Sequence, residues 1–227
     1  MKKKLLAMAG AALLSLSPLA PAQQSSTQEV VRAADSFLAI LTPDQRQKVM
    51  YAFDDAAQRA GWSNFPTGVV ARGGISLKQM TTAQQDAAMK LMATLLSPMG
   101  MQKVSEIREA DDDFKANGSK RGRGGRGPRP QGPPPGGQSG PAPFGGRGPG
   151  GPPTGGDLFG SDLYYISFLG TPSTTAPWML QFGGHHLALN ITIDGDKGVL
   201  TPTLTGAQPA TFTLNGKIVR PLGRTSA

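Results

Sequence analysis

The amino-acid sequence predicts an α+β protein, in which a helical half at residues 23–116 packs on an antiparallel β meander at residues 157–227. Before residue 117, apolar residues recur at the spacing of amphipathic helices. After residue 156, apolar and polar residues alternate with the period of two that is typical of strands. Residues 117–156 hold 16 Gly and 10 Pro and separate the two halves.

Residues 1–22 have the features of a secretory signal peptide. Three lysines precede an apolar segment at 5–16, and the small residues Ala20-Pro21-Ala22 follow it. The apolar segment is shorter than the roughly 20 residues that a membrane-spanning helix needs, and no later segment is long enough either. We therefore expect an exported protein, periplasmic or extracellular, with no transmembrane segment.

Capping signals divide the helical half into several helices. The Thr-x-x-Gln spacing of a capping box occurs at Thr42–Gln45 and again at Thr81–Gln84. Pro43 stands at a first helical position, and Ser97-Pro98 provides another start. We expect one helix over 30–41, one from Thr42 that buries Val49, Met50 and Phe53 and breaks at Gly61, one after Thr81, and one after Ser97.

The last of these helices is expected to end near the acidic residues Asp111–Asp113. The alternating Asp-x-Asp-x-Asp-Gly spacing of a calcium-binding loop is absent there. We interpret the three aspartates as a solvated helix end.

The β-rich half is expected to form a meander. Asp194–Gly198 and Asn215-Gly216 are hairpin turn signals, the second of type I′. Because the meander ends at Ala227 with nothing to cover its last edge, we expect an exposed apolar edge and a loosely packed, poorly soluble or oligomeric chain. The expected strands are 162–170, 177–184, 185–194, 198–202, 210–214 and 217–222.

The segment 117–156 is expected to be disordered, because its composition buries too little apolar surface to offset its chain entropy. It has six basic residues and no acidic one. It is either a solvated spacer or a segment weakly attracted to anionic envelope polymers or lipid headgroups. Export, and Phe144 as its only aromatic residue, argue against nucleic acid as a partner.

The adjacent histidines His185 and His186 are candidate ligand-binding residues. Consecutive strand residues point to opposite faces, so we expect His185 on the apolar face with Leu187, hydrogen-bonded to backbone at the edge of the core. His186 then lies beside Asn190 on the more polar face and is the better metal candidate. One ion cannot easily take both, and a zinc site needs about three or four ligands.

Three further residues are candidates for ligand binding. Trp178 could stack on a sugar or a peptide, or lie in the core. Arg72 shares a loop with Trp62 and Asn64, and loop residues often carry function. Asn190 accompanies His186 on the polar face. No nucleophile elbow, phosphate loop or dinucleotide fingerprint occurs in the predicted ordered parts, and no nucleophile has a plausible base.

Several stretches resemble an uncharacterised bacterial family, the domain of unknown function 3500: "LTPDQRQKVMYAFDD", "WSNFPTGVVARGGISLKQM" with the residues after it, "WMLQFGGHHLALNITIDG", and "TPTLTGAQPATFTLNGKIVRPL". The resemblance implies a mixed helix and sheet domain, usually exported, with no stated activity. It also implies longer members that continue past the position of Leu222. This chain departs by ending at Ala227 and by its Gly/Pro/Arg insertion, so we expect a truncated β-rich half.

These observations favour an exported binding or scaffold module of the cell envelope, whose biochemical function is unknown. The alternative is a metal-dependent hydrolase or redox enzyme in which His186 helps to hold a divalent metal. Whether the protein is an enzyme stays open at this point.

Overall fold

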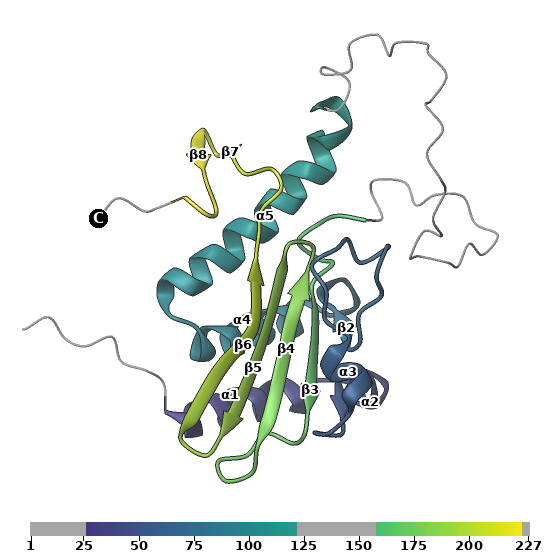
Figure 1. Ribbon diagram of the computed structural model, residues 1–227, viewed down its shortest axis with the longest axis vertical. Coiled ribbons are helices and arrows are strands. Elements are labelled where there is room, and N and C mark those ends of the chain that lie inside the picture. Colours follow the sequence, from purple (N-terminus) through teal and green to yellow (C-terminus); the bar gives the residue numbers. More distant parts are fainter. Residues whose placement is uncertain (1–25, 122–157, 224–227) are drawn as a thin grey trace, which may run out of the picture.

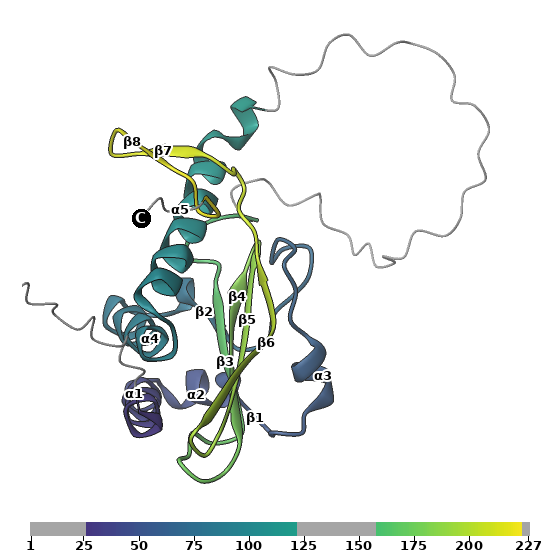
Figure 2. The same cartoon turned by 60° about the vertical axis from the view of Figure 1, so that its left-hand side comes forward.

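The computed structural model describes residues 26–121 and 158–223 (Figure 1). The predicted signal peptide and residues 122–156 of the predicted disordered segment lie outside the described residues. A central sheet has helices α1, α4 and α5 on one side and the short helix α3 on the other (Figure 2). The α+β prediction is confirmed, with two corrections to the division into halves.

Capping boxes begin the helices where the sequence predicts them. Thr42 and Thr81 each accept a hydrogen bond from the backbone N–H of the glutamine three residues on, and Ser26 caps α1 in the same way with Glu29. The helices are α1 (Thr27–Ala39), α2 (Pro43–Val49), α3 (Ala56–Ala60), α4 (Thr82–Leu95) and α5 (Pro98–Arg121), with a 3₁₀ turn η1 (Leu77–Gln79) before α4.

The first correction is that the N-terminal half supplies strands as well as helices. The helix after Thr42 ends at Val49, and β1 (Met50–Tyr51) pairs in parallel with β3 (Tyr165–Leu169). β2 (Ile75–Ser76) pairs antiparallel with the same strand. The sheet is therefore mixed, and the two sides of the Gly/Pro/Arg segment are joined by backbone hydrogen bonds.

The second correction concerns the end of the last helix. α5 runs on past Asp111–Asp113 to Arg121, so the predicted helix end near the acidic run is wrong. The reason is packing: Val104, Ile107 and Asp111 share one buried stripe of the helix, and Phe114 after the acidic run packs edge-on against Phe159, with ring centroids 4.7 Å apart.

The central sheet has the strand order β1-β3-β4-β5-β6, with β2 beside β3. Its antiparallel strands are β3, β4 (Trp178–Gly184), β5 (Leu187–Asp194) and β6 (Lys197–Thr205). The sequence places the exposed edge at the last expected strand, 217–222, but the edge of the central sheet is β6, where Val199 and Leu200 are 51% and 45% exposed. Association through this edge stays a prediction.

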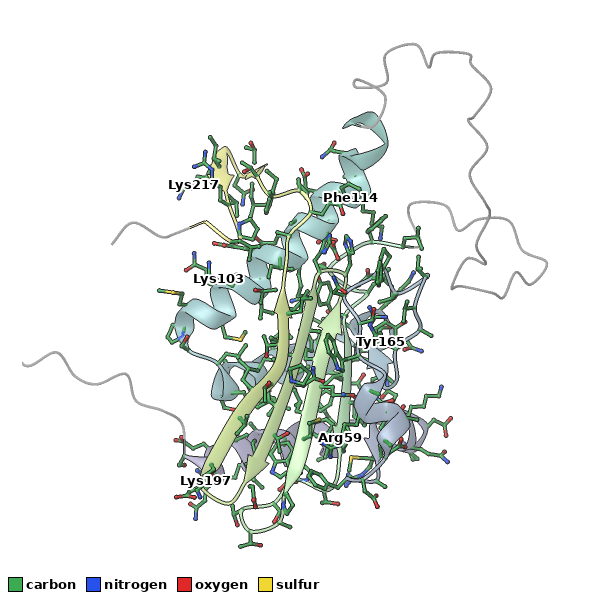
Figure 3. All side chains as sticks on the ribbon, in the orientation of Figure 1. Arg59, Lys103, Phe114, Tyr165, Lys197 and Lys217 are labelled. Atoms are coloured by element: carbon green, nitrogen blue, oxygen red, sulfur yellow. The ribbon has the colours of Figure 1, made fainter. Side chains whose placement is uncertain are left out.

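The last two strands do not continue the meander, contrary to expectation. β7 (Phe212–Leu214) and β8 (Lys217–Val219) form a separate two-stranded sheet beside α5 (Figure 1). Lys103 Nζ of α5 donates to the carbonyl of Pro221, 2.8 Å away, just after this hairpin (Figure 3). The turn residues Asn215 and Gly216 have φ of 49° and 77°, which confirms the predicted type I′ turn.

The core fills the space between the sheet and the helices. Phe37 of α1 stacks on Phe168 of β3, with ring centroids 6.0 Å apart, and the ring of Trp178 of β4 lies 6.2 Å from that of Phe168. All three rings are fully buried. Among residues 26–121 and 158–223, no helix combines the length and apolar character that crossing a membrane requires.

Candidate functional site

A row of buried polar side chains crosses the face of the sheet that points away from α1, α4 and α5 (Figure 2). Ser167 of β3 stands opposite Gln181 of β4, which stands opposite Asn190 of β5. The neighbouring strand positions point to the helices and are apolar, because strand side chains alternate between faces. All three polar residues are buried.

Hydrogen bonds join this row to helix α3. Gln58 Nε2 donates to Gln181 Oε1 at 2.8 Å and to Ser167 Oγ at 3.1 Å. Gln181 Nε2 donates to Asn190 Oδ1 at 2.9 Å, and Asn190 Nδ2 donates to the carbonyl of Pro202 at 2.8 Å. The row therefore links α3 to four strands, β3 to β6, and a buried amide that lost its partner would destabilise the fold.

The loop after α3 folds around the guanidinium of Arg72. This side chain donates to the backbone carbonyls of Ser63 at 2.8 Å and Phe65 at 2.5 Å, and also to that of Val70. Burial lowers the pKa of Arg72 from its usual value, and Tyr165 opposes that shift. Within the described part of the chain, no carboxylate pairs with Arg72.

The loop and the polar row border a small recess with a cavity volume of about 30 Å³. Arg72 lies in its wall, and its buried Nε has no hydrogen-bond partner among the described atoms. Trp62 and Tyr165 supply aromatic surface, and Tyr165 lies at the loop end of β3 (Figure 3). The floor includes Gly183, where a Cβ would come within 2.5 Å of the Leu187 carbonyl, so no larger side chain fits.

Two of the residues singled out from the sequence meet in this recess, namely Arg72 and Asn190. Trp178 does not, because it lies in the core on the opposite face of the sheet and is fully buried. Its Nε1 donates to the Ser173 carbonyl at 3.0 Å. Trp178 therefore has no exposed ring surface on which a ligand could stack.

The two histidines lie outside the recess, and their predicted placement on opposite strand faces is wrong. They form the two-residue turn between β4 and β5, and the strand begins only at Leu187. His186 has φ of 59°, in the left-handed region. Strand alternation does not apply in a turn, and the two rings lie side by side with centroids 3.8 Å apart.

His185 instead pairs with Asp111, which corrects the interpretation of the acidic run as a solvated helix end. His185 Nδ1 lies 2.6 Å from Asp111 Oδ1, and the Tyr164 hydroxyl donates to Asp111 Oδ2 at 3.1 Å. The same hydroxyl lies 2.9 Å from the His185 carbonyl. The three side chains are buried, with relative exposures of 2%, 4% and 0% for Asp111, His185 and Tyr164.

Burial dominates the electrostatics of this cluster. It raises the pKa of Asp111, while hydrogen bonds from His185 and Tyr164 oppose the shift. It also raises the pKa of the Tyr164 hydroxyl, together with the charge of Asp111. The spacing Val104, Ile107, Asp111 is the signal that sequence reasoning missed, since it places the aspartate on the buried stripe of the helix.

His186, the metal candidate, is half-buried. Its Nε2 lies 3.1 Å from Gln208 Oε1, and its backbone N–H donates to the Asn64 carbonyl at 2.8 Å. Across the described ranges 26–121 and 158–223, no group of three or more His, Cys, Asp and Glu side chains is arranged to hold a metal ion. A metal at His186 would need further ligands from elsewhere.

Comparison with known proteins places the chain in a family but names no activity. No curated protein and no solved structure matches it. One family model matches residues 23–227, and its description is "protein of unknown function (DUF3500)". The chain belongs to this DUF3500 family.

Proposed function

We propose that the protein is an exported binding module of the cell envelope that holds a small polar ligand in the recess beside Arg72. The observation that carries this proposal is the unpaired, buried Nε of Arg72 in the recess wall. A buried donor without an acceptor is costly, and a ligand oxygen would satisfy it. The uncompensated positive charge of Arg72 favours an acidic or strongly polar oxygen.

The other walls narrow the ligand class to a sugar-like group. Trp62 and Tyr165 offer aromatic faces that pack on the apolar side of a ring, while Ser63 and Asn190 are polar. A cavity volume of about 30 Å³ is far below that of a site that encloses a whole ligand, so the recess suits one acidic substituent, and the ring that carries it would rest at the opening. Acidic amino sugars of envelope glycans combine these features.

The test is isothermal titration calorimetry, in which the purified mature protein is titrated with N-acetylmuramic acid and, separately, with N-acetylglucosamine. We expect saturable binding, tighter for the acidic sugar, and a loss of about tenfold or more in affinity for Arg72→Met. Arg32→Met is the matched control, because Arg32 is exposed on α1, outside the recess.

Arg72 also donates hydrogen bonds to the loop carbonyls, so its substitution could disturb the loop as well as the recess. A second variant therefore separates an effect on ligand binding from an effect on loop folding. Tyr165→Ala removes aromatic surface from the recess without touching the Arg72 hydrogen bonds, and it should weaken binding as well. The proposal is contradicted if the wild-type protein binds neither sugar, or if neither Arg72→Met nor Tyr165→Ala lowers the affinity.

The second candidate function is a metal-dependent hydrolase or redox enzyme that uses His186. In its favour, His185 beside it is oriented through Nδ1 by the Asp111 carboxylate, an arrangement that is common around metal-binding histidines. Elemental analysis after incubation with zinc, copper and iron tests this candidate. It predicts a stoichiometric metal that is lost in His186→Asn, a variant that tolerates the left-handed backbone.

A further inference from the structure

We infer that Gln58 is a specificity-determining residue of the recess, where its side-chain oxygen Oε1 serves as a hydrogen-bond acceptor for the ligand. The recess then selects an acid that carries an N–H or O–H donor beside its carboxylate. This inference rests on the proposed function and deepens it, because it adds a second group to the oxygen that Arg72 would bind.

The direction of the hydrogen bonds in the polar row is fixed from its far end, the backbone carbonyl of Pro202. A carbonyl oxygen accepts hydrogen bonds and cannot donate them. The Asn190 atom that lies 2.8 Å from this carbonyl must therefore be the amide nitrogen Nδ2, which leaves Oδ1 to face Gln181. Since Oδ1 also accepts only, Gln181 turns Nε2 toward it, 2.9 Å away, and turns Oε1 toward helix α3.

Gln58 is the last amide of this chain, and its orientation follows from the one before. The atom that meets Gln181 Oε1 at 2.8 Å must be a donor, Nε2, which also donates to Ser167 Oγ at 3.1 Å. A flipped carboxamide would bring two acceptor oxygens, those of Gln58 and Gln181, against each other. The polar row therefore holds Gln58 with Oε1 directed away from the other amides.

Gln58 Oε1 is free to accept a hydrogen bond from a ligand. Among residues 26–121 and 158–223, no donor lies within hydrogen-bond distance of this oxygen. Gln58 is half-buried and lines the recess, and its Oε1 is not among the fully buried unpaired atoms, so a molecule in the recess can reach it.

Gly73 brings this oxygen close to the Arg72 wall of the recess. A Cβ on Gly73 would lie 1.9 Å from Gln58 Oε1, so the carboxamide occupies space that only glycine leaves open. Arg72, Gly73 and Gln58 all line the recess. Its cavity volume of about 30 Å³ is roughly two to three times what one water needs, so one small group that fills it meets both walls.

The two walls require different ligand atoms. Arg72 Nε is a donor on a positively charged group, which a carboxylate oxygen satisfies. Gln58 Oε1 is an acceptor, and it would remain unpaired beside a ligand that offers oxygen acceptors alone. An N–H or O–H group next to the carboxylate satisfies both walls. Hydroxy acids and N-acyl amino acids have this arrangement, and N-acetylmuramic acid carries an acetamido N–H.

The experiment compares two pairs of acids that differ in the donor. In the first pair, propionate has a methyl group in place of the hydroxyl of glycolate. In the second, N-acetylsarcosine has a methyl group in place of the amide hydrogen of N-acetylglycine. Each acid is titrated into the purified mature protein at about pH 7, where all four are ionised, and binding is followed by protein NMR.

We expect wild-type protein to bind the donor-bearing member roughly fivefold more tightly in at least one pair. A preference in the glycolate pair identifies a hydroxyl as the donor, and a preference in the N-acetylglycine pair identifies an amide.

The preference should disappear in Gln58→Met, which keeps the length of the side chain and removes Oε1. A variant that merely loosened the recess would weaken both members of a pair equally and leave their ratio unchanged. Gln47→Met is the matched control, because Gln47 is exposed on α2, outside the recess, and it should keep the wild-type preference.

Gly73→Ala tests the same oxygen without altering Gln58. Gly73 does not have a positive φ, so its backbone accepts alanine. The added methyl group meets the far end of the Gln58 side chain, which must rotate away, and the preference should fall here too.

A wild-type protein without a preference, or a preference that persists in both Gln58→Met and Gly73→Ala, would overturn the inference. If wild type binds both members of a pair equally and Arg72→Met weakens both, the recess proposal stands and the role of Gln58 is refuted. If wild type binds none of the four acids, the role of Gln58 is likewise refuted, and binding of N-acetylmuramic acid decides the recess proposal separately.

Discussion

The two faces of the central sheet are built from alternate residues of the same strands, yet they differ in what they bury. The face toward α1, α4 and α5 is filled by large apolar side chains such as Phe168, Leu180 and Phe182, all nearly inaccessible. The other face carries the row Ser167, Gln181 and Asn190 under α3 and its loop.

The difference shows how one sheet can combine stability with a binding surface. On the helix face, burial of apolar area supplies the stabilisation, and tight packing leaves little freedom. On the polar face, hydrogen bonds hold α3 and its loop against the sheet, and a recess remains beside them. Substitutions on the helix face should therefore destabilise the protein through lost apolar burial, and those on the polar face through lost hydrogen bonds.

The largest expected effect comes from the helix face. Phe168→Ala removes a fully buried ring that stacks with both Phe37 and Trp178, and should lower the free energy of unfolding by about 3–5 kcal/mol. Urea unfolding followed by circular dichroism measures the change. A loss below about 1 kcal/mol would mean that this side of the sheet is not the densely packed one.

The next largest effect is expected from the buried pair of His185 and Asp111, at the turn between β4 and β5. His185→Ala leaves Asp111 buried without its histidine partner and should cost roughly 3 kcal/mol. His186→Asn alters the adjacent, half-buried ring and should cost no more than about 1 kcal/mol. Equal losses in the two variants, in the same unfolding experiment, would show that the Asp111 contact is not the source of the stabilisation.

A smaller effect is expected from the polar row. Asn190→Leu removes the closer of the two acceptors of Gln181 Nε2 and a donor to the Pro202 carbonyl, which should cost about 1–3 kcal/mol. Thr192→Val, at the next position on the same strand face, should stay within about 0.5 kcal/mol. If Asn190→Leu stabilised the protein, the polar row would be kept for ligand binding and not for holding α3.

The smallest effect is a pH dependence that comes from Asp111. Because burial raises the pKa of this carboxyl, the folded protein keeps the proton to a higher pH than the unfolded chain does. Its contribution to stability is therefore complete below the ordinary aspartate pKa of 3.8 and is lost as pH rises through the pKa in the folded protein.

Urea unfolding of wild type and Asp111→Asn over a pH series from about 4 to about 7 tests this sign. The stability of wild type relative to the variant should fall as pH increases, since asparagine does not titrate. A relative stability that rises with pH would show that the hydrogen bonds from His185 and Tyr164 outweigh burial.

Local signals in the sequence were sufficient for much of the fold. The capping boxes at Thr42 and Thr81 and the Asn215-Gly216 turn lie where they were predicted, because each depends on contacts within a few residues. The alternation in β5 likewise predicted an apolar face and a polar face, with Asn190 on the polar one. Membership of the family was also evident from these stretches.

Contacts between distant segments decided the rest. Met50 and Tyr51 follow a helix and form a strand only because β3, more than a hundred residues later, offers backbone partners. Asp111 is a buried partner of His185 only because α5 crosses the β4–β5 turn. Arg72 and Asn190 reach the same recess only because α3 and its loop fold back over the sheet. A periodic pattern reports which face of an element is buried, whereas the partner that covers it depends on tertiary packing.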